Sequence, residues 1–275
     1  MGKPIIKSGK FHAGTDLRCG ENVVIDVAEE VVVGDRCVLP ENAYLGGRRI
    51  QIGDDFFGYS WEWKRLDVGR GRKDDEHAVL TVGDRSTFHD NRIDLAAPVV
   101  VGDDVGLSPE VVLYCHYYWQ SVLQGFPCKY QGVRIGNGTL VGFRSTILPG
   151  ADIADGCVIG AGSVVSGKLT HEQAVYAGNP ARLIRKIEEP SRHAKQHLLV
   201  DLMAEYAASR NYRGYKTPWP VDYPIINAAG TKIDVEARTL EGPEDEHTDD
   251  IRWFLFTRGV RIYTRRPFGK LGRKS

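Results

Sequence analysis

The sequence lacks three features that would define its partners at once: a net charge, a long apolar run and paired cysteines. Its 36 basic residues balance 36 acidic ones, so nothing favours nucleic acid or an anionic membrane as a partner. No apolar run approaches the roughly 20 residues that span a bilayer. The first residues lack the apolar core of a signal peptide. We therefore expect a cytoplasmic protein without membrane insertion.

The five cysteines are scattered and form no CxxC pair, which argues against a zinc site built on cysteine. Cys37 and Cys157 fall at small interior positions of the repeat described next. We expect them to be packed thiols in a reducing compartment, and we predict no metal.

What the sequence does contain is a strict period of six residues. An aliphatic residue recurs at every sixth position, and the residue four places later is almost always small. In the most regular stretch the aliphatic residues are Ile135, Val141, Ile147, Ile153, Ile159 and Val165. Neither the helical period of about 3.6 nor the strand period of 2 fits this spacing. The pattern predicts a parallel β-helix of hexapeptide repeats, in which three hexapeptides form one triangular coil.

The repeat predicts an all-β domain over residues 1–187 with two interruptions. The segments near 55–79 and 114–133 do not follow the period and carry aromatic and charged residues. We expect loop excursions there, because long irregular segments in a regular coil usually protrude from it.

A second domain is predicted over residues 188–275. A C-terminal helix should begin near Pro190, with Leu198, Leu202 and Tyr206 on one face. The rest is rich in turn-forming and aromatic residues, and we expect an irregular C-terminal extension.

The stretch IGNGTLVGFRSTILPGADIADGCVIGAGSVVSG, followed by VYAGNPARLIRKI, resembles the hexapeptide-repeat acyltransferases. The resemblance is closest to the cytoplasmic sugar O-acetyltransferases that act on galactosides, maltose or polysaccharides. It covers about residues 25–187 and is most specific over 101–187. It implies a left-handed β-helix, a homotrimer, and acetyl-CoA as co-substrate in the groove between neighbouring subunits. The implied acceptor is a hydroxyl of a sugar, a nucleotide sugar or a polysaccharide precursor.

The resemblance implies that His116, at the start of the second excursion, is the catalytic base. An imidazole titrates near neutrality, so it can take the proton of an acceptor hydroxyl that attacks the thioester. Transfer would then be direct, without an acyl-enzyme, and the neighbouring Cys115 would not be a nucleophile. An ordinary polar loop residue is the alternative for His116.

The same resemblance implies acceptor contacts by His89, Asn91 and Asp94, one coil earlier. Amide and carboxylate groups suit sugar hydroxyls, although Asn and Asp also favour bends of the chain. The residues implied to contact acetyl-CoA are Gly142, Phe143, Ala161, Ser166, Arg182 and Arg185. The two arginines match positions that meet the CoA phosphates, which a guanidinium binds well. Trp61, Trp63 and Trp119 would suit stacking on a sugar face.

Other functions stay open at this stage. A metal hydratase on the same fold needs paired histidines four or five residues apart, and Gln120 and Ser121 stand where a partner of His116 would be. A non-enzymatic β-helix scaffold would bind partners without chemistry. An N-acetyltransferase for an amino sugar would use the same base. Chloramphenicol-type acetyltransferases share the fold and the histidine, so antibiotic inactivation is a further alternative. The acyl chain length is not indicated by the repeats.

Overall fold

The computed structural model describes residues 2–60, 65–210, 220–228 and 230–264 of the chain. The chain divides into two compact units, Met1–Ile187 and Glu188–Ser275, each with its own hydrophobic core. Among the described residues, no helix is long and apolar enough to cross a membrane.

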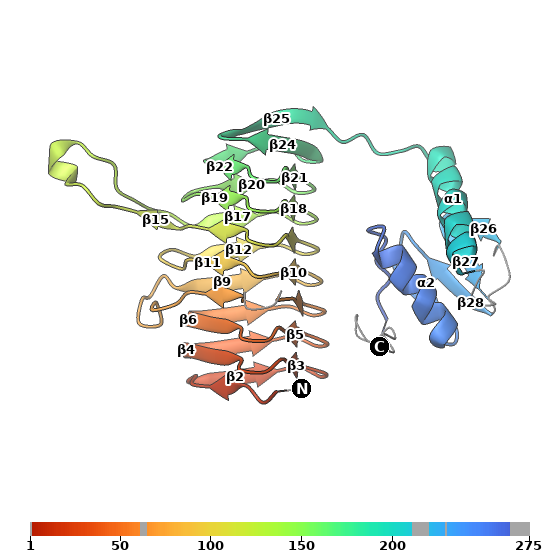
Figure 1. Ribbon diagram of the computed structural model, residues 1–275, viewed down its shortest axis with the longest axis horizontal. Helices are drawn as coiled ribbons and strands as arrows, with labels where there is room; N and C mark the ends of the chain where they lie inside the picture. Colours follow the sequence, from red (N-terminus) through yellow and green to blue (C-terminus); the bar gives the residue numbers. More distant parts are fainter. Residues whose placement is uncertain (1, 61–64, 211–219, 229, 265–275) are drawn as a thin grey trace. The chain divides into compact units, whose positions relative to one another are not determined.

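The first unit is a parallel β-solenoid (Figure 1), as the six-residue period predicts. Its short strands stack into three parallel ladders, here called A, B and C, which the chain visits in the order C, A, B in each coil. Ladder A contains β8 (Asp67–Val68), β11 (Arg92–Ile93), β14 (Val112–Leu113), β19 (Thr146–Ile147) and β22 (Val164–Val165). Ladder B contains β9 (Val79–Val82), β12 (Val99–Val101), β17 (Val133–Ile135), β20 (Asp152–Ile153) and β23 (Lys168–Leu169). The handedness of the coil stays a prediction.

Ladder C completes each coil. Its parallel strands are β3 (Arg18–Cys19), β5 (Val38–Leu39), β7 (Phe57–Gly58), β10 (Thr87–Phe88), β13 (Gly106–Leu107), β18 (Leu140–Val141), β21 (Val158–Ile159) and β24 (Ala174–Gly178). The last strand, β25 (Ala181–Lys186), pairs antiparallel with β24. Two long strands, β4 (Val24–Val33) and β6 (Tyr44–Ile52), run through both ladders A and B in the first coils. The strands β1 (Ile5–Ile6) and β2 (Lys10–Ala13) pair with β4.

The interior explains the composition of the repeat. The aliphatic residue that ends most of the short strands points inward, and Val141, Ile147 and Ile159 are almost fully buried. Small polar residues at the bends bond to the backbone of the next coil: the hydroxyl of Ser145 donates to the carbonyl of Gly160 at 3.0 Å. A buried hydroxyl is tolerated there because it is hydrogen-bonded.

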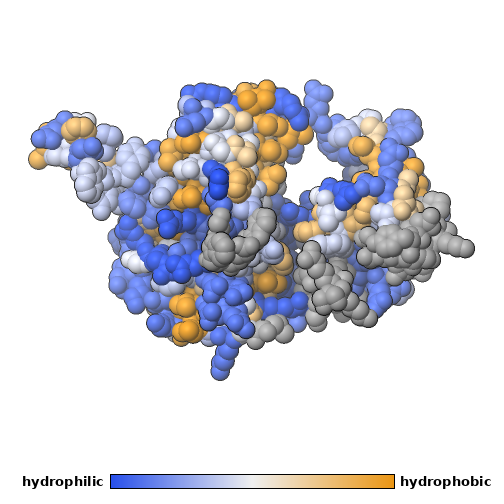
Figure 2. All heavy atoms as spheres, in the orientation of Figure 1, coloured by the Kyte–Doolittle hydropathy of each residue, from blue (hydrophilic) through white to orange (hydrophobic). Residues whose placement is uncertain are grey.

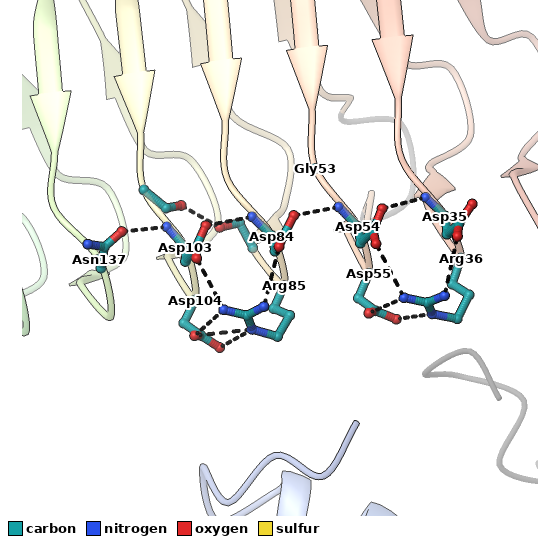
Figure 3. A network of polar contacts seen from close by, with 12 residues as sticks. Asp35, Arg36, Gly53, Asp54, Asp55, Asp84, Arg85, Asp103, Asp104 and Asn137 are labelled. Carbon is teal, nitrogen blue, oxygen red and sulfur yellow. Dashed lines mark hydrogen bonds and ion pairs between the residues drawn. The ribbon is translucent and has the colours of Figure 1, made fainter. Parts of the chain in front are cut away.

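A ladder of side chains follows the corner between ladders B and C (Figure 3). At each coil, a carboxylate or amide oxygen accepts a hydrogen bond from the backbone N–H of the corresponding residue one coil below. Asp84 accepts from Asp54 at 2.8 Å, Asp103 accepts from Asp84 at 2.9 Å, and Asn137 accepts from Asp103 at 2.9 Å. Arg36 and Arg85 pair with the carboxylates alongside. The two arginines therefore offset part of the negative charge of this B–C corner ladder, and its hydrogen bonds tie successive coils together.

The two predicted excursions differ from each other. The segment 55–79 is only partly an excursion, because β7 and β8 continue the coil and the described part that leaves it is the loop 69–78. Residues 61–64, with Trp61 and Trp63, lie outside the described part of the chain.

The segment 114–133 does leave the coil. It forms an antiparallel hairpin of β15 (His116–Tyr117) and β16 (Lys129–Tyr130), with a 3-10 turn η1 (Val122–Gln124) at its tip. Figure 1 shows this hairpin projecting away from the stacked coils.

The second unit is more regular than the sequence predicted. The predicted helix is α1 (Arg192–Arg210). The expected irregular extension is wrong for the described residues, which form the antiparallel strands β26 (Val221–Asp222), β27 (Ile225–Ala228), β28 (Thr231–Asp234) and β29 (Thr239–Glu241) and the helix α2 (Glu246–Phe256). The buried face of α1 carries Leu199, Met203 and Tyr206, and Leu202 packs against the same core. Of the expected face, only Leu198 is misplaced, since it is 53% exposed.

Candidate active site

His116 and Asp94 form a hydrogen-bonded pair at the corner between ladders A and B. Asp94 directly follows β11, and His116 begins the hairpin that leaves the next coil after β14. His116 Nδ1 lies 2.5 Å from Asp94 Oδ2. Because a carboxylate only accepts, the proton of the neutral imidazole sits on Nδ1, and Nε2 carries the free lone pair. This is the tautomer that a general base requires.

Asp94 is held firmly in this orientation. Its Oδ1 accepts from the backbone N–H of Ala96 at 3.2 Å, a local turn that aspartate favours. Its Oδ2 also accepts from the N–H of Cys115 at 3.1 Å. The acceptor contact expected of Asp94 stays a prediction, and in the structure its carboxylate is hydrogen-bonded to His116.

Aromatic side chains of the hairpin hold the imidazole from the other side. The ring of His116 stacks on Tyr130 with centroids 5.4 Å apart, and on Tyr118 with centroids 5.7 Å apart. The pairing of β15 with β16 sets His116 directly opposite Tyr130. The imidazole is therefore fixed on its hydrogen-bonded side and on its face, while its side chain remains 24% exposed. Tyr118 and Tyr130 were not singled out from the sequence, since their role depends on hairpin register.

Cys115 is fully buried, and this burial raises the pKa of its thiol to about 12. A thiol with such a pKa is protonated at neutral pH and is a poor nucleophile. The geometry is therefore compatible with direct transfer.

The other two predicted acceptor residues lie at a different corner, between ladders C and A. Asn91 is buried and fully engaged, since its Oδ1 accepts from the N–H of His89 and its Nδ2 donates to the carbonyl of Ser108, both at 2.8 Å. Asn91 thus stabilises a bend of the coil, and the acceptor site proposed below does not include it. Burial lowers the pKa of His89, whose Nδ1 has no hydrogen-bond partner among the residues that the structure describes.

Most of the predicted CoA residues line this same C–A corner. The strand register stacks His89, Ser108, Gly142, Gly160 and Ala177 in one column along it. Gly142 has no room for a side chain, because a Cβ there would lie 2.6 Å from the backbone nitrogen of Ala161. Next to this column stand Phe143, which is 42% exposed, and Ala161, which is also exposed.

Arg182 stands at the C-terminal end of the column, because β25 pairs it with Ala177. Arg185 is opposite Val175 on the same strand, and both arginines are exposed. The C–A corner therefore offers a narrow, glycine-lined edge that ends at two cations.

Ser166 belongs to the other corner. The register of β11, β14, β19 and β22 stacks it above Leu148, Tyr114 and Asp94. The chain thus places the predicted base with Ser166 at the A–B corner, and the other predicted CoA residues at the C–A corner. These two groups are separated by ladder A within one chain.

The outward positions of the C-terminal coils differ between ladders. On ladder C they are Leu140, Val158 and Val175, whereas on ladder B they are Arg134, Asp152 and Lys168. Leu140 is 45% exposed. Figure 2 shows hydrophobic residues gathered over the C-terminal coils. Exposed apolar surface of this kind marks interaction surfaces.

These features define the chain as a β-solenoid protein built on hexapeptide repeats, and comparison with known proteins agrees. Residues 132–167 match the family model described as bacterial transferase hexapeptide (six repeats). The resemblance to the hexapeptide-repeat acyltransferases is thereby confirmed.

The curated relatives are named as acetyltransferases. The galactoside O-acetyltransferase of Escherichia coli is 34% identical over 97 residues, which are 34% of this chain and 47% of that enzyme. A Saccharomyces cerevisiae protein, YJL218W, named an acetyltransferase only provisionally, is 38% identical over 114 residues, or 40% of this chain and 57% of that protein. The chain spans about half the length of these relatives.

Among solved structures, the polysialic acid O-acetyltransferase OatWY is similar with a TM-score of 0.57 and 16% identity, over 69% of this chain and 92% of that one. At 16% identity this similarity shows a shared fold and no more.

No group of three or more histidine, cysteine, aspartate or glutamate side chains suited to a metal ion occurs in the described ranges. His89 and His116 stand at different corners, so the arrangement gives no support to the hydratase alternative.

Proposed function

We propose that the protein is an acetyl-CoA-dependent O-acetyltransferase with His116 as its general base. The observation that carries the proposal is the His116–Asp94 pair, which leaves Nε2 of a firmly held imidazole free. The curated relatives, named as acetyltransferases, support the reaction class.

The proposed reaction is a direct transfer. Nε2 of His116 takes the proton of the acceptor hydroxyl while that oxygen bonds to the acetyl carbonyl carbon. The carbon–sulfur bond then breaks, and the proton passes from His116 to the departing thiolate, giving an acetyl ester and free CoA. Asp94 stabilises the imidazolium that exists between the two proton transfers. No covalent enzyme intermediate forms.

A homotrimer would bring the two groups of site residues together. The apolar outward positions of ladder C are the surface that we assign to contacts between copies. In such an assembly the C–A corner of one copy faces the A–B corner of the next. Acetyl-CoA would then lie along Gly142, Phe143 and Ala161 of one subunit, with its phosphates at Arg182 and Arg185 and its thioester near His116 of the other.

The proposed acceptor is a carbohydrate hydroxyl, on a sugar, a nucleotide sugar or a polysaccharide precursor, in the cytoplasm. Exposed tyrosine rings beside His116 support a sugar, because aromatic faces pack against apolar sugar faces. Trp119 is 88% exposed further out on the hairpin. An N-acetyltransferase acting on an amino sugar is the alternative within the same chemistry, and a non-enzymatic scaffold is the alternative outside it.

Titration calorimetry of the purified protein with CoA and acetyl-CoA tests the proposal. We expect saturable binding that Arg182→Ala weakens, since that change removes a guanidinium partner for phosphate. We also expect His116→Ala to bind CoA normally but to lose about 10²–10⁴-fold in turnover with a panel of sugars. Absence of binding at millimolar CoA would instead favour the scaffold.

A further inference from the structure

The loop 69–78 places Arg72 beside the catalytic pair. The backbone N–H groups of Arg72, Asp75 and Ala78 each donate to the carbonyl three residues earlier, at 3.0, 3.1 and 3.0 Å. Gly69, with φ of 56°, permits the bend by which the chain leaves ladder A. Consecutive hydrogen-bonded turns therefore fix the position from which the Arg72 side chain extends.

The guanidinium of Arg72 forms long ion pairs with two carboxylates but makes no hydrogen bond to either. Its Nε is 3.9 Å from Asp94 Oδ1, and its Nη1 is 3.6 Å from Asp75 Oδ2. With respect to all the residues that the structure describes, these N–H groups make no hydrogen bond. The side chain is 30% exposed. A guanidinium carries five donors in a rigid fork, so Arg72 can still bind a ligand.

Asp94 does not require Arg72 as a partner. Its oxygens already accept from two backbone N–H groups and from His116. Asp75 Oδ1 likewise accepts from the N–H of His77 at 2.9 Å. The N–H groups of Arg72 are thus not required by either neighbouring carboxylate.

Arg70, two residues earlier, shows the contrast. Its Nε bonds to Asp67 Oδ2 at 3.1 Å, and its guanidinium carbon lies 4.0 Å from the centroid of the Tyr44 ring. Arg70 therefore holds the loop on the coil through a hydrogen bond, whereas the contact of Arg72 with the coil is a long ion pair to Asp94.

The surroundings of Arg72 fit a sugar that carries a negative charge. Tyr130, which stacks on His116, is 53% exposed, and its phenol is close enough to Arg72 for the cation to counteract the rise in the pKa of Tyr130 that desolvation causes. A ligand at this position would meet an aromatic face, guanidinium N–H groups that make no hydrogen bond to the described residues, and Nε2 of His116 together. It would also need a cation to offset the nearby charge of Asp94.

We propose that Arg72 binds an anionic group of the acceptor, a carboxylate or a phosphate, and so directs a neighbouring hydroxyl toward His116. This inference rests on the proposed function, which it narrows to anionic sugars. Guanidinium pairs with carboxylate and with phosphate in the same forked geometry, so the experiment has to separate the two.

Binding is measured first, because it does not depend on turnover. The His116→Ala protein, saturated with CoA, is titrated with methyl glucuronide, UDP-glucose and methyl galactoside. We expect one of the two anionic probes to bind with an affinity that Arg72→Gln lowers about 10- to 100-fold, the loss typical of hydrogen bonds to a charged group. Loss confined to the glucuronide identifies a carboxylate, and loss confined to UDP-glucose identifies a phosphate. Absence of Arg72-dependent binding by either anionic probe would overturn the inference.

Turnover is then measured on the background with His116 intact. Arg72→Gln should raise KM for the anionic acceptor with little change for the neutral one, and Arg72→Lys should recover part of the loss. Lys73→Ala is the matched control, because Lys73 is the next cation in the same loop but pairs with Asp26. An equal loss for charged and neutral acceptors would mean that Arg72 is only structural. Absence of any His116-dependent turnover, with Arg72-dependent binding retained, would instead contradict the proposed function alone.

Discussion

At the scale of single residues, the sequence singled out His116 as the candidate base but did not reveal its environment. His116 stands where the resemblance implies a base, and the structure gives it a partner in Asp94. The partner was predicted to bind the acceptor, because an aspartate beside a sugar-modifying base has two plausible uses. Which one applies depends on how close the fold brings the imidazole to the carboxylate. The two residues are 22 positions apart in the sequence, so no local pattern shows that distance.

Replacing Asp94 with asparagine tests its role as the residue that orients His116. Asparagine keeps the size but offers an NH₂ group as well as a carbonyl, so Nδ1 can keep or lose its proton. We expect kcat to fall at least about tenfold, as the wrong tautomer becomes populated, with unchanged affinity for CoA. Steady-state kinetics and calorimetry measure the two effects. If KM for the acceptor rose while kcat stayed constant, Asp94 would be an acceptor contact after all.

Cys115 gives a second test at this scale, of direct transfer. Its thiol is buried with a pKa raised to about 12, whereas Cys128 is exposed on the hairpin. We expect Cys115→Ala to retain turnover, and a thiol reagent to modify Cys128 in the folded protein while Cys115 reacts only after unfolding. Mass spectrometry of peptides after labelling locates the modified residue. Loss of turnover in Cys115→Ala with normal folding would point to an acyl-enzyme.

At the scale of elements, the six-residue period predicted the coil well, because each hexapeptide shows the pattern within its own few residues. The six-residue spacing requires only that aliphatic side chains fill one interior, and each turn repeats that requirement. The segment 55–79 obscured the pattern although β7 and β8 continue the coil, because loops separate their hexapeptides. In α1, both Leu198 and Leu199 fit a helical stripe, and only the sheet packed against the helix decides that Leu199 is buried.

The B–C corner ladder was not predicted from the sequence, although a recurring sequence pattern marks it. A glycine precedes Asp35, Asp54, Asp84, Asp103 and Asn137 in each coil. The glycine is needed because a Cβ at Gly53 would lie 2.8 Å from the backbone nitrogen of Asp84. A recurring pair of glycine and aspartate at coil spacing therefore indicates such a ladder.

Asp84→Ala tests whether the ladder stabilises the coil through hydrogen bonds or through charge. The change leaves the N–H of Asp54 without its acceptor, which should cost about 1–3 kcal/mol. Asp84→Asn should be much milder, since Asn137 already serves as an acceptor in the same ladder. Thermal unfolding followed by circular dichroism compares them. As a control, Asp152→Ala removes only a surface ion pair with Arg134 and should change stability by about 0–1 kcal/mol. Equal destabilisation by Asp84→Ala and Asp84→Asn would assign the effect to charge.

At the scale of the whole molecule, one chain does not complete the site that its sequence implies. The proposed base, His116, lies at the A–B corner, and the glycine-lined edge with Arg182 lies at the C–A corner. Where the six-residue period is unbroken, counting along the sequence assigns each residue to a corner. The two loops interrupt the period, so the sequence alone did not assign the residues beside them. The separation is a reason to expect the assembly of copies, since a groove between two copies is where both corners can meet.

Mixing two inactive variants tests this arrangement. His116→Ala removes the base from the A–B corner, while Ala161→Trp fills the C–A corner with a bulky ring at an exposed position that the fold can accommodate. In randomly mixed trimers, each groove needs an intact A–B corner from one copy and an intact C–A corner from the next. Half of the copies supply each, so about a quarter of the wild-type activity should return on co-expression. If each chain held a complete site of its own, every site in the mixture would carry one defect, and no activity would return.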